Sequence, residues 1–155
     1  MTQYTGSGTC VSVSASSPAT HNAAGFAALT YTQLGELETV GEINIRHASV
    51  NFANLCTGKT TVIKGAEEAV EFDIGVALDR KDAGQALMTT ARKSLTAKVS
   101  IKIVDSAGDT VYLECYVMSE RIAGGAGVND VRMGNYTLGA IAPSSGDTAV
   151  VVLAA

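Results

Sequence analysis

Residues 98–117, with the sequence Lys-Val-Ser-Ile-Lys-Ile-Val-Asp-Ser-Ala-Gly-Asp-Thr-Val-Tyr-Leu-Glu-Cys-Tyr-Val, contain the pattern that decides the fold. Apolar and polar side chains alternate on both sides of a central run at 105–109. An alternation with a period of two is typical of a β-strand that buries one face. Asp, Ser and Gly in the central run suit a tight turn. The stretch therefore predicts a β-hairpin.

The same alternation recurs along much of the chain. It is clear at 11–14, 43–47 and 70–78, and a last extended region runs over 128–142, where Gly134 and Gly139 interrupt it. Each of these segments predicts a strand with one buried face, and the apolar tail 149–153 is expected to pair at a sheet edge.

Two segments depart from this pattern. Leu87, Ala91 and Leu95 recur at helical spacing, and Asp79 stands where an N-cap residue is expected, so residues 80–94 predict a helix. Residues 15–35 are rich in Ser, Ala, Thr and Gly and predict a loop.

The predicted fold is mainly β. We expect two packed antiparallel β-sheets, in the manner of a sandwich or barrel, with one flanking α-helix near residues 80–94. The 155 residues suffice for one domain with a sizeable core, spanning 1–155. Within it we expect an N-terminal segment, 1–35, and a C-terminal tail, 143–155.

Charge and hydropathy argue against two classes of partner. The formal net charge is −4 and no basic run exists, which disfavours gripping nucleic acid or an anionic membrane. The longest apolar run, 149–155, is too short to cross a bilayer. The first residues lack the charged and apolar regions of a secretory signal, so we expect no membrane contact.

The motifs that suggest catalysis are weak. Residues 53–60 match a relaxed phosphate-binding loop, but the following Thr61, Val62 and Ile63 favour a strand over the helix that phosphate binding needs. A hairpin turn at 57–59 is the simpler interpretation. His21 has no ligand partner at metal-binding spacing, and neither has the other histidine, His47. We therefore predict no catalytic, cofactor or metal site.

Acidic residues and cysteines leave alternatives open. Glu42, Glu71 and Asp73 occupy polar positions of predicted strands. Paired carboxylates perform glycosidase chemistry, but an acidic sheet face is more often solvated, and it also suits a wall that must not bind a polyanion. The cysteines are odd in number, which predicts a reducing cytoplasm and no internal disulfide framework; either free thiols or a cross-link between subunits is compatible with Cys10, Cys56 and Cys115.

The segment 48–64 is long for a hairpin connection, since most such loops have about 2–5 residues. It carries apolar residues that a solvated loop does not need, namely Val50, Phe52, Leu55, Val62 and Ile63. One interpretation is a protruding hairpin that packs on a neighbouring subunit of the same assembly or of the next layer. The alternative is an ordinary strand pair folded onto its own sheet.

Three features together form a recognisable layout: the long connection after the strand at 42–47, the single helix between β-pairs, and a late strand at 133–138. From about residue 40 to 142 this layout resembles the tail-tube, or major tail, protein family of long-tailed phages and related particles. The sequence departs from larger members of that family in having no appended surface domain after residue 142.

The resemblance implies a structural subunit rather than an enzyme, without cofactors. It implies six-membered rings that stack into a hollow tube, which holds the tape-measure protein and later passes DNA. Further expected partners are tail completion proteins, and the expected location is the virion tail, assembled in the host cytoplasm. The competing classes are a β-sandwich binding or decoration module of a virion and, less favoured, a small β-barrel enzyme.

Overall fold

The computed structural model describes residues 3, 5–125 and 127–155. Within them it contains two helices and ten strands. Their bounds are β1 (Cys10–Ser14), α1 (Ala23–Ala27), β2 (Thr32–Gln33), β3 (Leu37–Val40), β4 (Asn44–Ala53), β5 (Thr60–Val70), β6 (Phe72–Ala77), α2 (Ala83–Lys93), β7 (Val99–Val104), β8 (Thr110–Ile122), β9 (Met133–Ala140) and β10 (Ala149–Val152).

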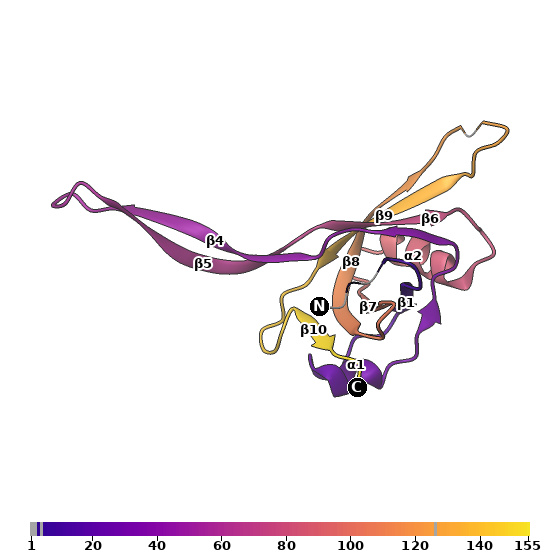
Figure 1. Cartoon of the computed structure of the whole chain (residues 1–155), viewed down its shortest axis with the longest axis horizontal. Coiled ribbons are helices and arrows are strands. Elements are labelled where there is room, and N and C mark those ends of the chain that lie inside the picture. Colours follow the sequence, from indigo (N-terminus) through magenta and orange to yellow (C-terminus); the bar gives the residue numbers. More distant parts are fainter. Residues whose placement is uncertain (1–2, 4, 126) are drawn as a thin grey trace.

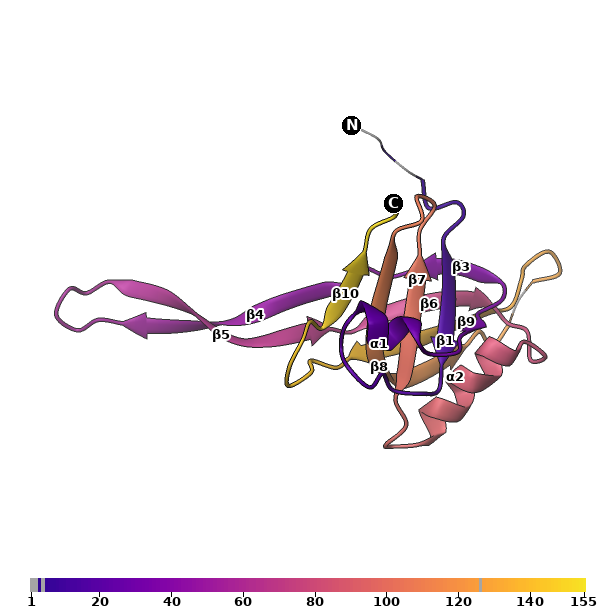
Figure 2. The same ribbon diagram turned by 90° about the horizontal axis from the view of Figure 1, so that it is seen from below.

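The strands form two antiparallel sheets of unequal size, which confirms the predicted class. The larger sheet has the order β2-β1-β7-β8-β9-β6-β3, with β10 paired to β8 as a side branch. Its two halves cross steeply: β1, β7 and β10 run across the direction of β3, β6 and β9 (Figure 2). The long strand β8 belongs to both halves, and a register shift between Val117 and Ser119 marks where its pairing becomes irregular.

The core lies between these two halves. Its fully buried side chains include Val13, Ile74, Ile101, Leu113 and Leu138, which come from five different strands. Alternation places each of them on the inner face of its strand. Helix α2 packs against β8 and β1 and contributes Met88 to the same core.

The hairpin predicted at 98–117 is present as β7–β8. Asp105 Oδ1 accepts backbone hydrogen bonds from Ala107 at 2.8 Å and from Asp109 at 3.0 Å. Gly108 adopts φ 91°, in the left-handed region where a side chain is strained. The turn residues therefore act as the sequence pattern indicated.

The helix begins later than predicted. Asp82, not Asp79, is the N-cap, and its carboxylate accepts a hydrogen bond from the Gln85 amide at 2.8 Å. Asp79 instead accepts from the Lys81 amide in the turn before the helix. Leu95 lies beyond the last turn and is exposed, so its helical spacing was misleading.

The predicted loop at 15–35 was also partly wrong, because it contains α1 and β2. Asn22 caps α1 by accepting a hydrogen bond from the Gly25 amide. Phe26 of α1 is buried and stacks on Tyr112, with ring centroids 5.5 Å apart. This contact fixes the segment against β8. In the described part of the chain, neither helix has the length and apolar character needed to cross a membrane.

The smaller sheet, β4–β5, projects away from the body as a long twisted hairpin (Figure 1). We call residues 44–70 the arm. Both of its strands continue almost directly into the body, because β3 precedes β4 and only Glu71 separates β5 from β6. The arm is thus an extension of the sheet rather than a separate loop.

Candidate assembly interface

The tip of the arm is a tight turn built on Asn54. Its side-chain oxygen accepts hydrogen bonds from the amides of Cys56 at 2.8 Å and Thr57 at 3.2 Å, and Gly58 adopts φ 66°. The residues that matched a phosphate-binding loop form this turn between two strands, with no helix after them. The geometry favours the hairpin interpretation over nucleotide binding.

The outer half of the arm has two different faces. Directly opposed residues of an antiparallel pair share a face, so Val50 with Ile63 and Phe52 with Thr61 lie on one side. Ser49 with Lys64 and Asn51 with Val62 lie on the other. The first side is apolar, and the second is mainly polar.

No part of the described chain covers the apolar side. Val50, Phe52 and Ile63 are 50%, 56% and 51% exposed, and Val62 and the tip residue Leu55 are more exposed still. The five residues predicted for an inter-subunit loop therefore all lie on the projecting arm. The alternative, a strand pair folded onto its own sheet, does not describe their surroundings.

At the base of the arm, hydrogen bonds join its two strands to each other and to the body. Arg46 Nε donates to Glu68 at 2.7 Å across the strand pair, and Thr148 Oγ1 donates to Glu67 at 2.8 Å from the C-terminal segment. The expectation of one buried strand face at 43–47 was wrong beyond Ile43, since Ile45 and His47 are exposed. These positions lie where the arm leaves the body.

The three acidic residues that suit a wall that must not bind a polyanion lie around one hollow at the base of the arm. Glu42, Glu71 and Asp73 line a space of about 590 Å³, together with Arg121 and Thr137. The structure therefore brings together residues that are up to 31 positions apart in sequence, between 42 and 73.

Sequence reasoning missed the two partners of Asp73. Thr137 Oγ1 donates to one carboxylate oxygen at 2.6 Å, and Arg121 Nη2 donates to the other at 2.6 Å. The Thr137 hydrogen bond has the largest effect and lowers the pKa of Asp73 below its ordinary value. Burial opposes it, and the hydrogen bond and charge of Arg121 each lower the pKa by a smaller amount. Arg121 continues the polar alternation of β8 after Ser119, a signal in the sequence that could have identified it.

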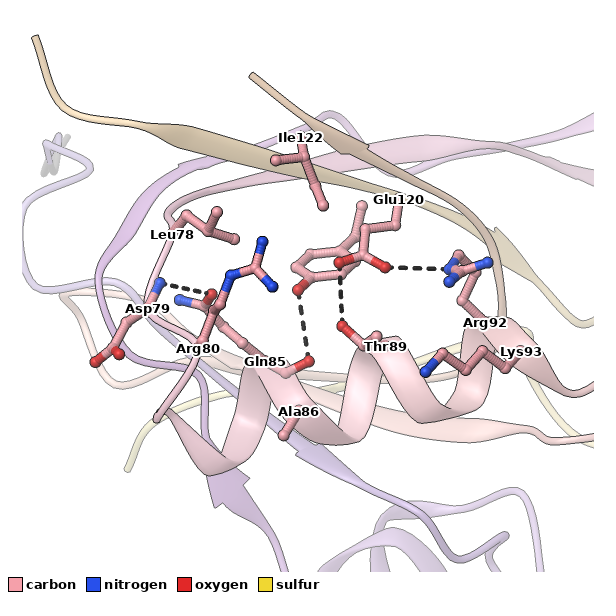
Figure 3. Close-up of a pocket in the computed structure, with 11 residues that line it drawn as sticks. Leu78, Asp79, Arg80, Gln85, Ala86, Thr89, Arg92, Lys93, Glu120 and Ile122 are labelled. Carbon is pink, nitrogen blue, oxygen red and sulfur yellow. Dashed lines mark hydrogen bonds and ion pairs between the residues drawn. The ribbon is translucent and has the colours of Figure 1, made fainter. Parts of the chain in front are cut away.

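A second hollow, of about 390 Å³, lies between α2 and β8 (Figure 3). Glu120 projects into it and accepts hydrogen bonds from Thr89 and Arg92, both at 3.1 Å. Tyr136 donates to the Gln85 carbonyl at 3.4 Å, and burial raises the pKa of its phenol. A phenol held protonated in this way is a poor general base.

The histidines and cysteines occupy separate places. His21 Nε2 lies 3.0 Å from the buried carboxylate of Glu114, whereas His47 lies on the arm. Cys10 and Cys56 are exposed, at the start of β1 and at the arm tip, while burial raises the pKa of Cys115 to about 12. Among residues 3, 5–125 and 127–155, no three His, Cys, Asp or Glu side chains come together as a metal ion requires.

The chain has no match among protein-family models or curated protein sequences. Among solved structures, the SPP1 tail tube aligns with 94% of this chain and 77% of its own, with a TM-score of 0.64 and 14% identity.

The chain has the fold of tail-tube proteins.

Two further structures share the tail-tube fold. A chain from the sheath/tube terminator of the extracellular contractile injection system PVC aligns with 100% of this chain and 99% of its own, with a TM-score of 0.64 and 12% identity. The tail of a GTA particle, refined with C6 symmetry, aligns with 81% of this chain and 87% of its own. The TM-score is 0.56 and the identity is 12%. The tail-tube fold predicted from the sequence layout is therefore confirmed.

Proposed function

We propose that this chain is a structural, non-enzymatic subunit of the tail tube of a phage or phage-like particle. The observation that carries the proposal is an amphipathic arm that projects from a tail-tube fold with its apolar side uncovered. An isolated two-stranded hairpin is marginally stable in water at best, so such an arm requires a partner surface. Other copies of the chain supply that surface.

In this function the arm joins subunits through Val50, Phe52, Leu55, Val62 and Ile63. Contact between an arm on one copy and a different surface on the next is heterologous, and such contacts build rings or open filaments. Rings of six that stack into a tube are the arrangement we propose, since one tail with the same fold was refined with C6 symmetry.

Glu42, Glu71 and Asp73 are proposed to face the channel. Like charge keeps a polyanion from binding to the wall, and Arg121 neutralises only one of the three carboxylates. Replacing Glu42 and Glu71 with Lys should leave assembly intact and slow the ejection of DNA. Unchanged ejection would place these residues outside the channel.

The remaining parts of the proposal concern location and partners. The subunits assemble in the host cytoplasm and form part of the virion tail, where the tube contains the tape-measure protein and is closed by tail completion proteins. DNA passes through it without specific contact.

Electron microscopy of the purified chain tests the function. At high protein concentration we expect rings or tubes in negative stain and a matching increase in light scattering. A species that stays monomeric at every concentration and salt level contradicts a tube and favours a binding or decoration module.

A further inference from the structure

The outer part of the arm differs in charge from the rest of the chain. Residues 48–66 contain Lys59 and Lys64 and no Asp or Glu. All 15 acidic residues therefore lie elsewhere, with the other 9 of the 11 Lys and Arg. Residues 48–66, which we call the outer arm, therefore have a formal charge of +2. The rest of the chain has a formal charge of −6, and together they give the net charge of −4. Neither lysine forms an ion pair with any described residue.

A groove on the body combines apolar residues with a charge opposite to that of the arm. It has a volume of about 510 Å³ and lies between β3 and the segment 6–9. Leu37 and Val40 supply apolar lining, Glu38 adds a carboxylate, and the small residues of Gly-Ser-Gly-Thr leave room for incoming side chains. Glu36 precedes β3 and is exposed, as is Glu38.

Strand β3 also has an unused hydrogen-bonding edge within the described chain. It is the last strand in the sheet order and pairs only with β6. An exposed strand edge is a template for pairing with another chain, and main-chain hydrogen bonds then supply affinity. The outer edges of the two-stranded arm are free in the same way.

Two of the other hollows suit a cationic arm less well. The hollow beside α2 is bordered by Arg80, Arg92 and Lys93, which outnumber its two carboxylates, Asp79 and Glu120. A smaller apolar hollow on the opposite side of α2 contains Lys98 as its charged residue. Like charges placed together disfavour docking at both.

We propose that the arm of one copy docks along the free edge of β3 in a neighbouring copy, with Lys59 and Lys64 close to Glu36 and Glu38. This inference rests on the proposed function, in which the arm joins subunits, and it names the receiving surface. The arm cannot reach its own β3, because β4 carries the tip away from the body (Figure 2). Ten extended residues in β4 span about 33 Å, enough to reach a neighbour.

Charge reversal tests the pairing, since every copy carries both surfaces. One variant is Lys59→Glu with Lys64→Glu, and the other is Glu36→Lys with Glu38→Lys. Each variant alone places like charges at every contact, so the concentration at which tubes form should rise on the order of tenfold. In an equal mixture, the acidic arm of the first variant meets the basic edge of the second, and the basic arm of the second meets the acidic edge of the first. The mixture should therefore form tubes at nearly the wild-type concentration.

Matched controls separate this inference from the proposed function. Lys81→Glu with Arg132→Glu lowers the net charge by the same amount as the arm variant, but on the body, and should assemble normally. Circular dichroism and thermal melting confirm that each variant folds. If both variants lose assembly and the mixture does not regain it, the arm docks elsewhere and the β3 site is wrong. If a variant without the outer arm still forms tubes, the proposed function of the arm fails instead.

Discussion

Asp73 illustrates how a single side chain keeps its charge on an exposed sheet face. Three neighbouring strands contribute to the arrangement, since Asp73, Thr137 and Arg121 lie on β6, β9 and β8. Because its pKa is lowered in the folded chain, ionised Asp73 adds stability above its unfolded pKa, and this contribution is lost as the pH falls through the folded value. The carboxylate therefore stays charged throughout the neutral range.

Thr137→Val tests this account at one atom. The substitution removes the hydroxyl that makes the largest contribution, so the pKa of Asp73 should rise toward its ordinary value. Carboxyl chemical shifts followed by NMR across pH 2 to 6 measure it directly (about the range in which a carboxyl group titrates). An unchanged titration would mean that Arg121 alone holds the charge.

Glu114 is a buried charged residue, so its contribution to stability depends strongly on its partners. It is 3% exposed, and His21, Lys98 and Ser17 approach its oxygens at 3.0, 3.5 and 3.4 Å. Removing both basic partners, by His21→Ala with Lys98→Met, should lower the free energy of unfolding by about 3 kcal/mol, because a buried carboxylate is left without a counter-charge.

The matched control adds Glu114→Gln to the same two substitutions. A neutral amide tolerates the loss of both partners, so chemical denaturation should show most of the stability regained. If the triple variant is no more stable than the double one, lost packing around His21 accounts for the change. The local pattern gave no sign of this cluster, because the N-terminal segment that covers Glu114 is remote in sequence.

At the scale of elements, the arm shows that alternation predicts a strand but does not predict that its apolar face is buried within the same chain. The alternation at 43–47 correctly predicted strand, but Ile45 is exposed in the single chain, as are Val50 and Phe52 further along β4. A period of two shows that a strand has an apolar face and does not say which chain covers it. By contrast, the β7–β8 alternation predicted both the strands and their burial, because a covering layer exists within the same molecule.

Short or capped elements were the least predictable. Helix α1 spans five residues, too few for periodicity to appear. The start of α2 depended on which of two nearby Asp residues acts as the cap, and local sequence allowed both. The break at Glu71, where the strand passes from the arm into the larger sheet, has no local marker either.

Deleting the outer arm tests its role as an element. Replacing residues 48–66 with Asn-Gly joins His47 to Glu67, which are already paired, through a favoured two-residue turn. Because the removed side chains are almost all exposed, melting and circular dichroism should stay close to wild type while tube formation is lost. Unfolding or aggregation of this variant would assign the segment to the core.

At the scale of the whole molecule, the thiols report on assembly. Cys56 at the arm tip and Cys10 at the start of β1 are exposed, whereas Cys115 is buried with its pKa raised to about 12. A maleimide should therefore label two thiols in the monomer, since reaction requires an accessible thiolate.

In assembled tubes, docking of the arm should protect Cys56. Quantifying label at each cysteine by mass spectrometry, with Cys56→Ser as the control, gives the answer. Equal labelling of Cys56 before and after assembly would mean that the tip stays in solvent. Non-reducing gels of the same samples test the cross-link between subunits, which stays a prediction.

The continuity of the arm with the body also has a mechanical meaning. Strands β3, β6 and β9 run along the direction in which the arm projects (Figure 2). A pull on the arm is therefore transmitted lengthwise along β6, and it loads the hydrogen bonds to β3 and β9 in shear, so that they must break together. A hairpin attached crosswise would peel one bond at a time under a much smaller force. Copies linked through such arms would carry axial tension through the sheet backbone itself, and they would yield first where one copy's arm meets the next.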